Sequence, residues 1–190
     1  MNRRMQSRLF VTFPIIVMCV LIASAVGGGQ ASTRILIDTR AFTLKVLQGN
    51  QETLTFSDIA IGRYGATTDK RRGDHKTPLG RFTIAWITDK TSFHRFFGFR
   101  YPSREYADRA LQEGYLDQKS WDKIDRAWAS GRLPPQDTIL GGHLGIHGVG
   151  RGDEKIHEQY NWTSGCVALT NDQIDLLTAW IKVGTPVEIR

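Results

Sequence analysis

Asn161-Trp162-Thr163-Ser164-Gly165-Cys166-Val167-Ala168-Leu169-Thr170 is the most informative stretch of this 190-residue chain, which has only two cysteines. The other cysteine, Cys19, lies in an apolar N-terminal segment. A lone thiol cannot form an intramolecular disulfide, and an exposed thiol is a liability in an oxidising compartment unless its reactivity is used. The alternative is a buried, inert cysteine that acts as a small hydrophobic residue.

The candidate partner of Cys166 is His147, which lies nineteen residues before it in Ile146-His147-Gly148. A free thiol has a pKa of about 8.5, so only a small part is thiolate at neutral pH, and a nearby imidazole can take the proton. Gly165 allows a tight turn, and we expect its N–H, with that of Cys166, to face the oxyanion of a tetrahedral intermediate. The residues therefore predict a cysteine enzyme of acyl transfer.

The N-terminus predicts export. Three arginines occur within residues 1–8, residues 9–22 carry no charge, and Ala23-Ser24-Ala25 resembles a cleavage site. We expect a signal peptide over residues 1–25, a short linker over 26–33, and a periplasmic or cell-envelope location. The alternative is an uncleaved anchor, because the apolar stretch is close to the length that spans a bilayer. Only in that case would the protein contact the membrane.

Charge and length exclude some classes. The formal net charge is +6, but it includes the N-terminal arginines, so the remaining chain is only mildly basic and nucleic acid is not an expected partner. A basic loop over residues 70–76 could attract an acidic polymer, although such loops are commonly only solvated. The remaining length fits one domain, from residue 34 to 190, whose core needs no disulfide.

Alternating apolar residues and turn residues predict a mainly β domain. A hairpin is expected from residues 34–38 and 42–47, with further strands over 53–61 and 80–87. Between the last of these and His147, two short amphipathic helices are expected, the first capped by Ser103 and the second over residues 120–129. We interpret residues 98–136 as a helical insertion.

The C-terminal third places the reactive residues at strand ends. Strands are expected over residues 138–147, broken by Gly141-Gly142, and over 167–169. Thr170 with Gln173 forms a capping-box pattern that predicts a helix with Ile181 on its apolar face. Residues 187–189 are expected to form a final strand.

These motifs together resemble the L,D-transpeptidase (YkuD-type) catalytic domain. His147-Gly148 and Thr163-Ser164-Gly165-Cys166 match the family's histidine and Ser/Thr-x-Gly-Cys motif, and Thr77-Pro78-Leu79-Gly80-Arg81-Phe82 matches an upstream motif. The resemblance covers roughly residues 34–190. It implies a β-sandwich, Cys166 as the nucleophile, His147 as the base, and Gly165, Gly148, Ser164 and Thr163 as backbone or orienting residues. It implies no cofactor and no metal.

The resemblance also implies the substrate, a peptidoglycan stem peptide. Cys166 would attack the carbonyl of an L-centre, expel the following D-amino acid and hold an acyl-thioester. An amine acceptor then gives transfer, which is the leading expectation. Water as the acceptor gives a carboxypeptidase, or an amidase that detaches wall-linked lipoprotein. The surroundings of Trp162 are most similar to the branch that includes periplasmic lipoprotein-releasing enzymes.

Two positions depart from the family pattern. Many members have histidine where this chain has Ser164, and arginine where it has Ala168. Without that arginine, other residues must hold the donor peptide. The candidates for substrate binding are Arg63, Lys70, His143, Arg151 and Trp162.

Two other classes compete with the enzyme. His143, His147 and His157 with Cys166 could form a zinc site, but their spacing matches no common zinc pattern. His157 and His94 taken singly are expected to be surface residues. A non-catalytic module that binds the cell wall is the last alternative, and it predicts that the thiol is dispensable.

Overall fold

The computed structural model describes residues 32–190. The expected signal peptide and nearly all of the expected linker lie outside the described residues. Within the part that is described, no helix is both long enough and apolar enough to cross a membrane.

The described chain is mainly β, as predicted, with ten strands and four helices. The strands are β1 (Thr33–Asp38), β2 (Thr43–Gln48), β3 (Gln51–Phe56), β4 (Ala66–Thr67), β5 (Thr77–Pro78), β6 (Gly80–Thr88), β7 (Phe96–Phe99), β8 (Gly145–Gly148), β9 (Val167–Leu169) and β10 (Pro186–Ile189). The helices are α1 (Arg104–Gln112), α2 (Gln118–Ala129), α3 (Glu154–Gln159) and α4 (Asn171–Thr178).

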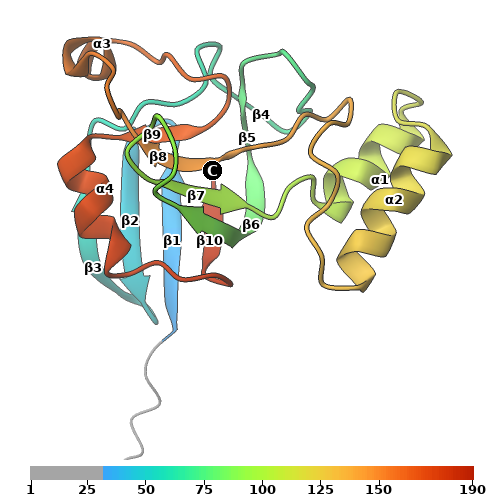
Figure 1. The fold of residues 1–190 in the computed structure, drawn as a ribbon, viewed down its shortest axis with the longest axis horizontal. Helices are drawn as coiled ribbons and strands as arrows, with labels where there is room; N and C mark the ends of the chain where they lie inside the picture. The colour runs from blue at the N-terminus through green and yellow to red at the C-terminus, as the bar shows by residue number, and fades with distance from the viewer. Residues whose placement is uncertain (1–31) are drawn as a thin grey trace, which may run out of the picture. The chain divides into compact units, whose positions relative to one another are not determined.

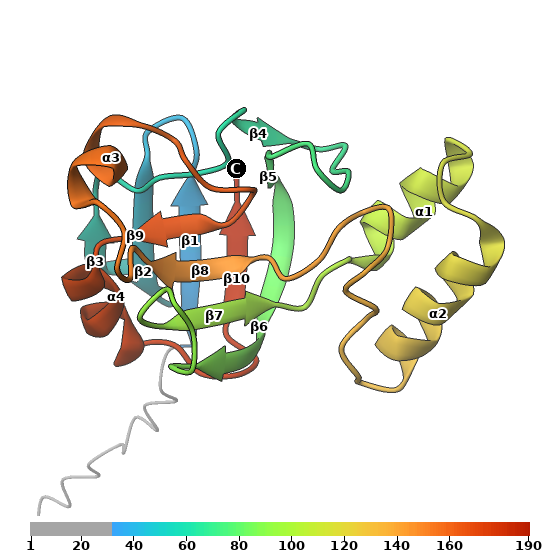
Figure 2. The same ribbon diagram turned by 45° about the horizontal axis from the view of Figure 1, so that its top comes forward.

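Eight strands form one hydrogen-bonded series that folds into two layers. Their order is β3-β2-β1-β10-β6-β7-β8-β9, and β4 pairs separately with β5. Strand β6 belongs to both layers, because residues 80–83 pair with β10 and residues 84–88 pair with β7, with a register irregularity between Ile84 and Trp86. Figures 1 and 2 show β7, β8 and β9 crossing the direction of β1, β2, β3 and β10. The predicted sandwich is therefore present.

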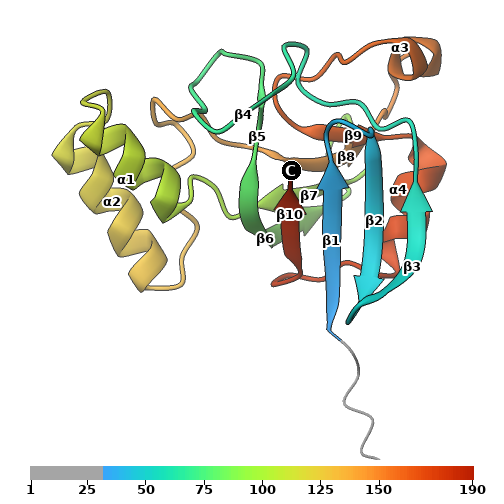
Figure 3. The same cartoon turned by 180° about the vertical axis from the view of Figure 1, so that it is seen from behind.

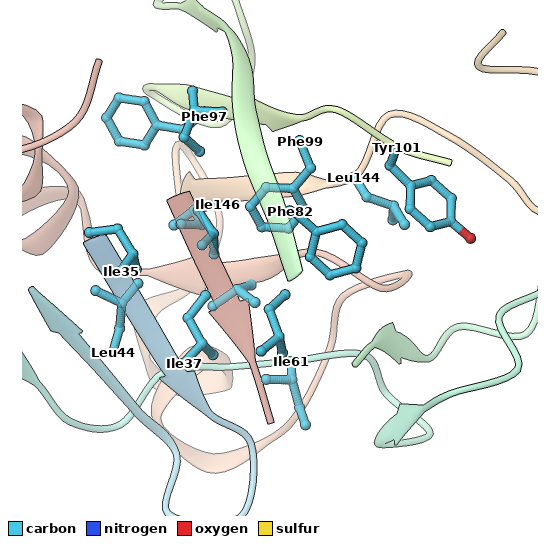
Figure 4. Packing of buried hydrophobic residues seen from close by; sticks show 14 of the residues in the cluster. Ile35, Ile37, Leu44, Ile61, Phe82, Phe97, Phe99, Tyr101, Leu144 and Ile146 are labelled. Atoms are coloured by element: carbon cyan, nitrogen blue, oxygen red, sulfur yellow. The ribbon is translucent and has the colours of Figure 1, made fainter. Parts of the chain in front are cut away.

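The core lies between these layers. Ile35 and Ile37 on β1 and Leu44 on β2 are almost fully buried, as expected for side chains that alternate along a strand. They meet Phe99 and Ile146 from the crossing layer (Figure 4). Figure 3 shows the β1 layer from its other side. Because β8 and β9 contribute to this core, the chain on either side of them has a fixed position.

The helical pair and the capped C-terminal helix form where the sequence predicts. Ser103 accepts a hydrogen bond from the Tyr106 N–H at the start of α1, and Asp117 caps α2. Thr170 and Gln173 make both bonds of the capping box. Helix α4 ends before Ile181, which is nevertheless buried.

Several boundaries differ from the prediction. Residues 98 and 99, which the sequence predicts to begin the insertion, belong instead to the buried strand β7, where Gly98 leaves room for the Trp86 ring. Strand β3 ends at Phe56 rather than at Ile61. Residues 138–140 form a turn with a single bridge between Thr138 and Gly141, because the positive φ of Gly141 breaks the extended backbone.

Candidate active site

Cys166 and His147 are placed by two neighbouring parallel strands. His147 on β8 lies opposite Ala168 on β9, and Cys166 precedes Ala168 by two residues. Side chains two residues apart on an extended chain point to the same side. The two side chains accordingly line one cavity of about 590 Å³.

This cavity combines aromatic and polar walls. Its lining is Arg63, Trp86, Thr88, Lys90, Thr91, Phe93, Phe96, Gly142, His143, Leu144, His147, Trp162, Thr163, Ser164 and Cys166. The cavity therefore brings the His147 motif and the Cys166 motif together with residues 86–96. This last segment carries no motif.

The His147 ring is fixed by aromatic contacts and one hydrogen bond. Its side chain is 2% exposed, and the ring centroids of Phe93, Phe96 and Trp162 lie 4.2, 5.8 and 5.6 Å away. Nδ1 lies 2.7 Å from the carbonyl oxygen of Gly148. A carbonyl can only accept, so Nδ1 carries the hydrogen and Nε2 keeps its lone pair.

Burial sets the charge of this histidine. It lowers the pKa of His147 to about 4, and the bond to the Gly148 carbonyl only partly opposes this effect. His147 is therefore neutral at neutral pH and can accept a proton.

The Cys166 thiol is also uncharged at rest. Burial raises its pKa to about 11, although the side chain keeps an opening to the cavity, while a bond from the Gly145 N–H and the charge of Lys70 lower it. The thiol donates to the His143 carbonyl, 3.6 Å from the sulfur. Among residues 32–190, no hydrogen bond joins this thiol to His147 in the resting arrangement.

The turn before Cys166 is held by Thr163. The Thr163 hydroxyl donates to the Cys166 carbonyl at 2.7 Å and accepts from the Gly165 N–H at 3.1 Å. The Gly165 N–H, which the sequence predicts to face an oxyanion, is therefore bonded to Thr163 in the resting structure. Gly165 has a φ of +126°, so the turn does depend on glycine.

The candidate substrate-binding residues separate into three groups. Arg63, His143 and Trp162 line the cavity. Arg151 lies instead in a neighbouring cavity of about 370 Å³, which Trp162 also lines. Lys70 reaches neither cavity, because its buried ammonium is paired with Asp74. The expectation that Lys70 holds substrate is thus corrected.

The residues that replace the family pattern have different surroundings. Ser164 is exposed, lines the cavity and lies 3.2 Å from His75 Nδ1. Ala168 is fully buried, and its backbone is bonded to Ala60 in both directions. A long side chain at Ala168 would have to displace its neighbours.

The zinc alternative lacks a ligand set. No three His, Cys, Asp or Glu side chains gather as a metal site in the described part of the chain. His94 is exposed and contacts Asp175, as expected for a surface residue. His157 differs from that expectation, because it is 3% exposed and accepts from the Trp162 indole N–H at 3.3 Å.

Sequence reasoning missed the residues that enclose His147. Phe93 and Phe96 come from the loop and strand after β6, and Lys90 adds a cation to the cavity wall. The sequence signal for them is the aromatic run from Phe93 to Phe99. That run does not reveal that Phe93 and Phe96 contact His147 in the folded chain.

Comparisons with known proteins identify the family of the chain. The family model of the L,D-transpeptidase catalytic domain, YkuD, matches residues 32–189. No curated protein matches the chain.

Two solved structures are similar in fold. The helical cell shape determining protein Pgp2 from Campylobacter jejuni has 17% identity and a TM-score of 0.56, over 84% of this chain and 47% of that one. Bd1075 from Bdellovibrio bacteriovorus has 20% identity and a TM-score of 0.54, over 85% of this chain and 48% of that one. The chain thus spans about half the length of these structures. Since the family match covers nearly all of the described residues, the chain belongs to the L,D-transpeptidase (YkuD) catalytic-domain family.

Proposed function

We propose that this protein is an exported cysteine acyl-transferase that acts on peptidoglycan stem peptides through a Cys166 thioester, with His147 as the base. Family membership supports the reaction class. The observation that carries the residue assignment is that Cys166 and His147 reach one cavity from neighbouring parallel strands.

The proposed first half-reaction uses the free Nε2 of His147. The Cys166 sulfur attacks the carbonyl carbon of the L-centre as the thiol proton passes to Nε2. The carbon–nitrogen bond then breaks, and His147 returns the proton to the departing D-amino acid. The products are an acyl-thioester at Cys166, a free amine and a neutral imidazole.

The second half-reaction reverses these roles. An acceptor amine attacks the thioester carbonyl and loses a proton to His147, which returns a proton to the sulfur as it leaves. An acceptor stem peptide gives a crosslink, and a lipoprotein lysine gives an anchor. The same thioester attacked by water would give a carboxypeptidase or an amidase.

The charges favour proton transfer during attack over a preformed ion pair. With a thiol pKa of about 11 and an imidazole pKa of about 4, both groups are neutral in the free protein. The hydrogen bond from the thiol to the His143 carbonyl must break before the thiol proton can reach His147. We infer that substrate binding replaces the thiol bond to the His143 carbonyl with a bond to His147. Catalytic hydrogen bonds commonly become short only in the complex with substrate.

Substrate binding is assigned to cations that face the cavity. Arg63 and Lys90 are exposed and line it, so both can meet the carboxylates of a stem peptide. We assign them the role of the family arginine that is absent at Ala168. Arg151 would act only on a substrate that extends past Trp162.

Export rests on the N-terminal pattern alone. We expect protein recovered from the cell envelope to begin between Val26 and Thr33, as measured by intact mass. A full-length product confined to the cytoplasm would contradict export.

The reaction is tested with muropeptides of defined stem length, with and without lipoprotein-linked fragments. We expect crosslinked dimers or exchanged terminal D-amino acids, identified by mass. Shortened stems or free lipoprotein peptide without an amine adduct would instead show a hydrolase. If the protein bound the cell wall without converting any muropeptide, the result would favour the non-catalytic binding module.

A further inference from the structure

Lys70 is a buried cation that the proposed reaction does not yet use. Its side chain is 3% exposed, its ammonium pairs with Asp74, and it also donates to the Arg71 carbonyl at 3.0 Å. Lysine is almost never fully buried unless it is paired, because desolvation of the charge is costly. A buried ion pair is therefore a feature that needs a reason.

Asp74 fixes this ammonium through the loop that carries both residues. Its carboxylate accepts the backbone N–H groups of Arg71 at 2.8 Å and Lys76 at 2.9 Å. The loop between β4 and β5 thus wraps around one carboxylate. Tyr115, from the helical pair, donates to Asp69 in the same loop at 2.7 Å. The loop that holds the ammonium is thus itself bonded to the helical pair.

The stem of Lys70 lies directly against the turn that presents the nucleophile. A Cβ atom added to Gly165 would stand 3.3 Å from Lys70 Cε and 2.7 Å from the Lys76 carbonyl oxygen. Gly165 immediately precedes Cys166. The absence of a side chain at Gly165 is what allows the cation to approach this closely.

Within residues 32–190, the lysine and arginine that line the cavity are not buried and paired as Lys70 is. Arg63 and Lys90 line the cavity but are exposed, so solvent and salt screen their charges. His147 is neutral. Lys70 acts on the thiol in the direction that favours thiolate. The charged and titratable groups around Lys70 and the sulfur are Arg63, Arg71, Asp74, His75, Lys76, Lys90, His143 and His147.

We propose that Lys70 is a positioning residue of the active site, whose ammonium, anchored by Asp74 behind Gly165, stabilises negative charge on the Cys166 sulfur. The role assigned to this charge rests on the proposed function, since a thioester forms only from an ionising thiol.

The test measures how fast iodoacetamide alkylates Cys166 as a function of pH. Alkylation is read by mass on the peptide that contains Cys166, because the full chain also contains Cys19. For Lys70→Met with Asp74→Asn, we expect the rate at about pH 8 to fall by about tenfold, which corresponds to one pKa unit. The alkylation rate of Lys70→Met alone should fall further, because the unpaired negative charge of Asp74 then opposes formation of the thiolate.

Lys119→Met is the matched control, since it removes the same charge from an exposed position of α2 that lies outside the cavity. Its alkylation rate should stay within about twofold of the unmodified protein. Urea denaturation shows that each variant is folded, and the double variant covers the case in which Lys70→Met alone unfolds. A folded double variant that alkylates at the unmodified rate would overturn the proposal. Alkylation needs no peptidoglycan, so a failure of the proposed function is seen separately in the muropeptide assay.

Discussion

Replacing Cys166 with alanine is expected to remove acyl transfer, by at least about 10⁴-fold, because Cys166 is the only thiol within residues 32–190 that can form the thioester. The measurement is conversion of muropeptides, together with the intact mass of the protein during turnover. The unmodified protein should show an acyl adduct, and Cys166→Ala should show none. Dimer formation that persists in this variant would remove Cys166 from the mechanism.

Stability separates this loss from a structural one. The Cys166 side chain is only partly buried, and alanine removes a single heavy atom, so the free energy of unfolding should change by less than about 1 kcal/mol. Ser164→Ala is the control within the same turn. Ser164 is exposed and contacts His75 rather than His147, so its loss should reduce transfer by less than about tenfold.

Local sequence signals predicted the elements that depend on local chemistry. The capping box of Thr170 and Gln173 and the Ser103 cap each need only residues within one helical turn, and each forms. The hairpin of β1 and β2 needs only alternation and a short turn. Cys166 and His147 were selected as candidates from sequence motifs and the family resemblance, and the structure places both on one cavity.

Features that depend on distant contacts were missed. Strand β7 is four residues of apolar sequence, which by itself is compatible with either a strand or part of a helix. The enclosure of His147 by Phe93 and Phe96 exists only because β7 pairs with β8. The composition of the loop around Lys70 predicted solvation, whereas Asp74 makes burial of the ammonium possible.

The oxyanion expectation shows the limit of motif reasoning most clearly. A glycine before a nucleophile is compatible with a free N–H and with a turn that needs a positive φ. Here the Thr163 hydroxyl takes the Gly165 N–H, and Lys70 occupies the space beside it. The sequence contains Thr163, Gly165 and Lys70, but only the folded chain shows that they lie against one another.

His147→Gln is expected to lower the rate of acyl transfer by about 10² to 10⁴-fold, because glutamine can keep a donor near the Gly148 carbonyl but cannot accept a proton. The measurement is kcat with defined muropeptides. His94→Gln is the control, because His94 is exposed and paired with Asp175. It should retain the unmodified rate, and an equal loss in both variants would assign the effect to something other than base catalysis.

The same substitution should make the fold less sensitive to acid. The pKa of His147 falls from 6.5 to about 4 on folding, so the unfolded chain binds more protons, and stability is lost as pH falls through this window. Between about pH 7.5 and about pH 4.5, the unmodified protein should lose on the order of 2 kcal/mol more unfolding free energy than His147→Gln. Urea denaturation at both pH values measures the difference. The pKa of His157 is also lowered by burial, but His157 is present in both proteins, so its contribution cancels in the difference between them. Equal losses in the two proteins would mean that His147 is not held neutral by burial, and its assignment as a base free to accept the thiol proton would lose its electrostatic support.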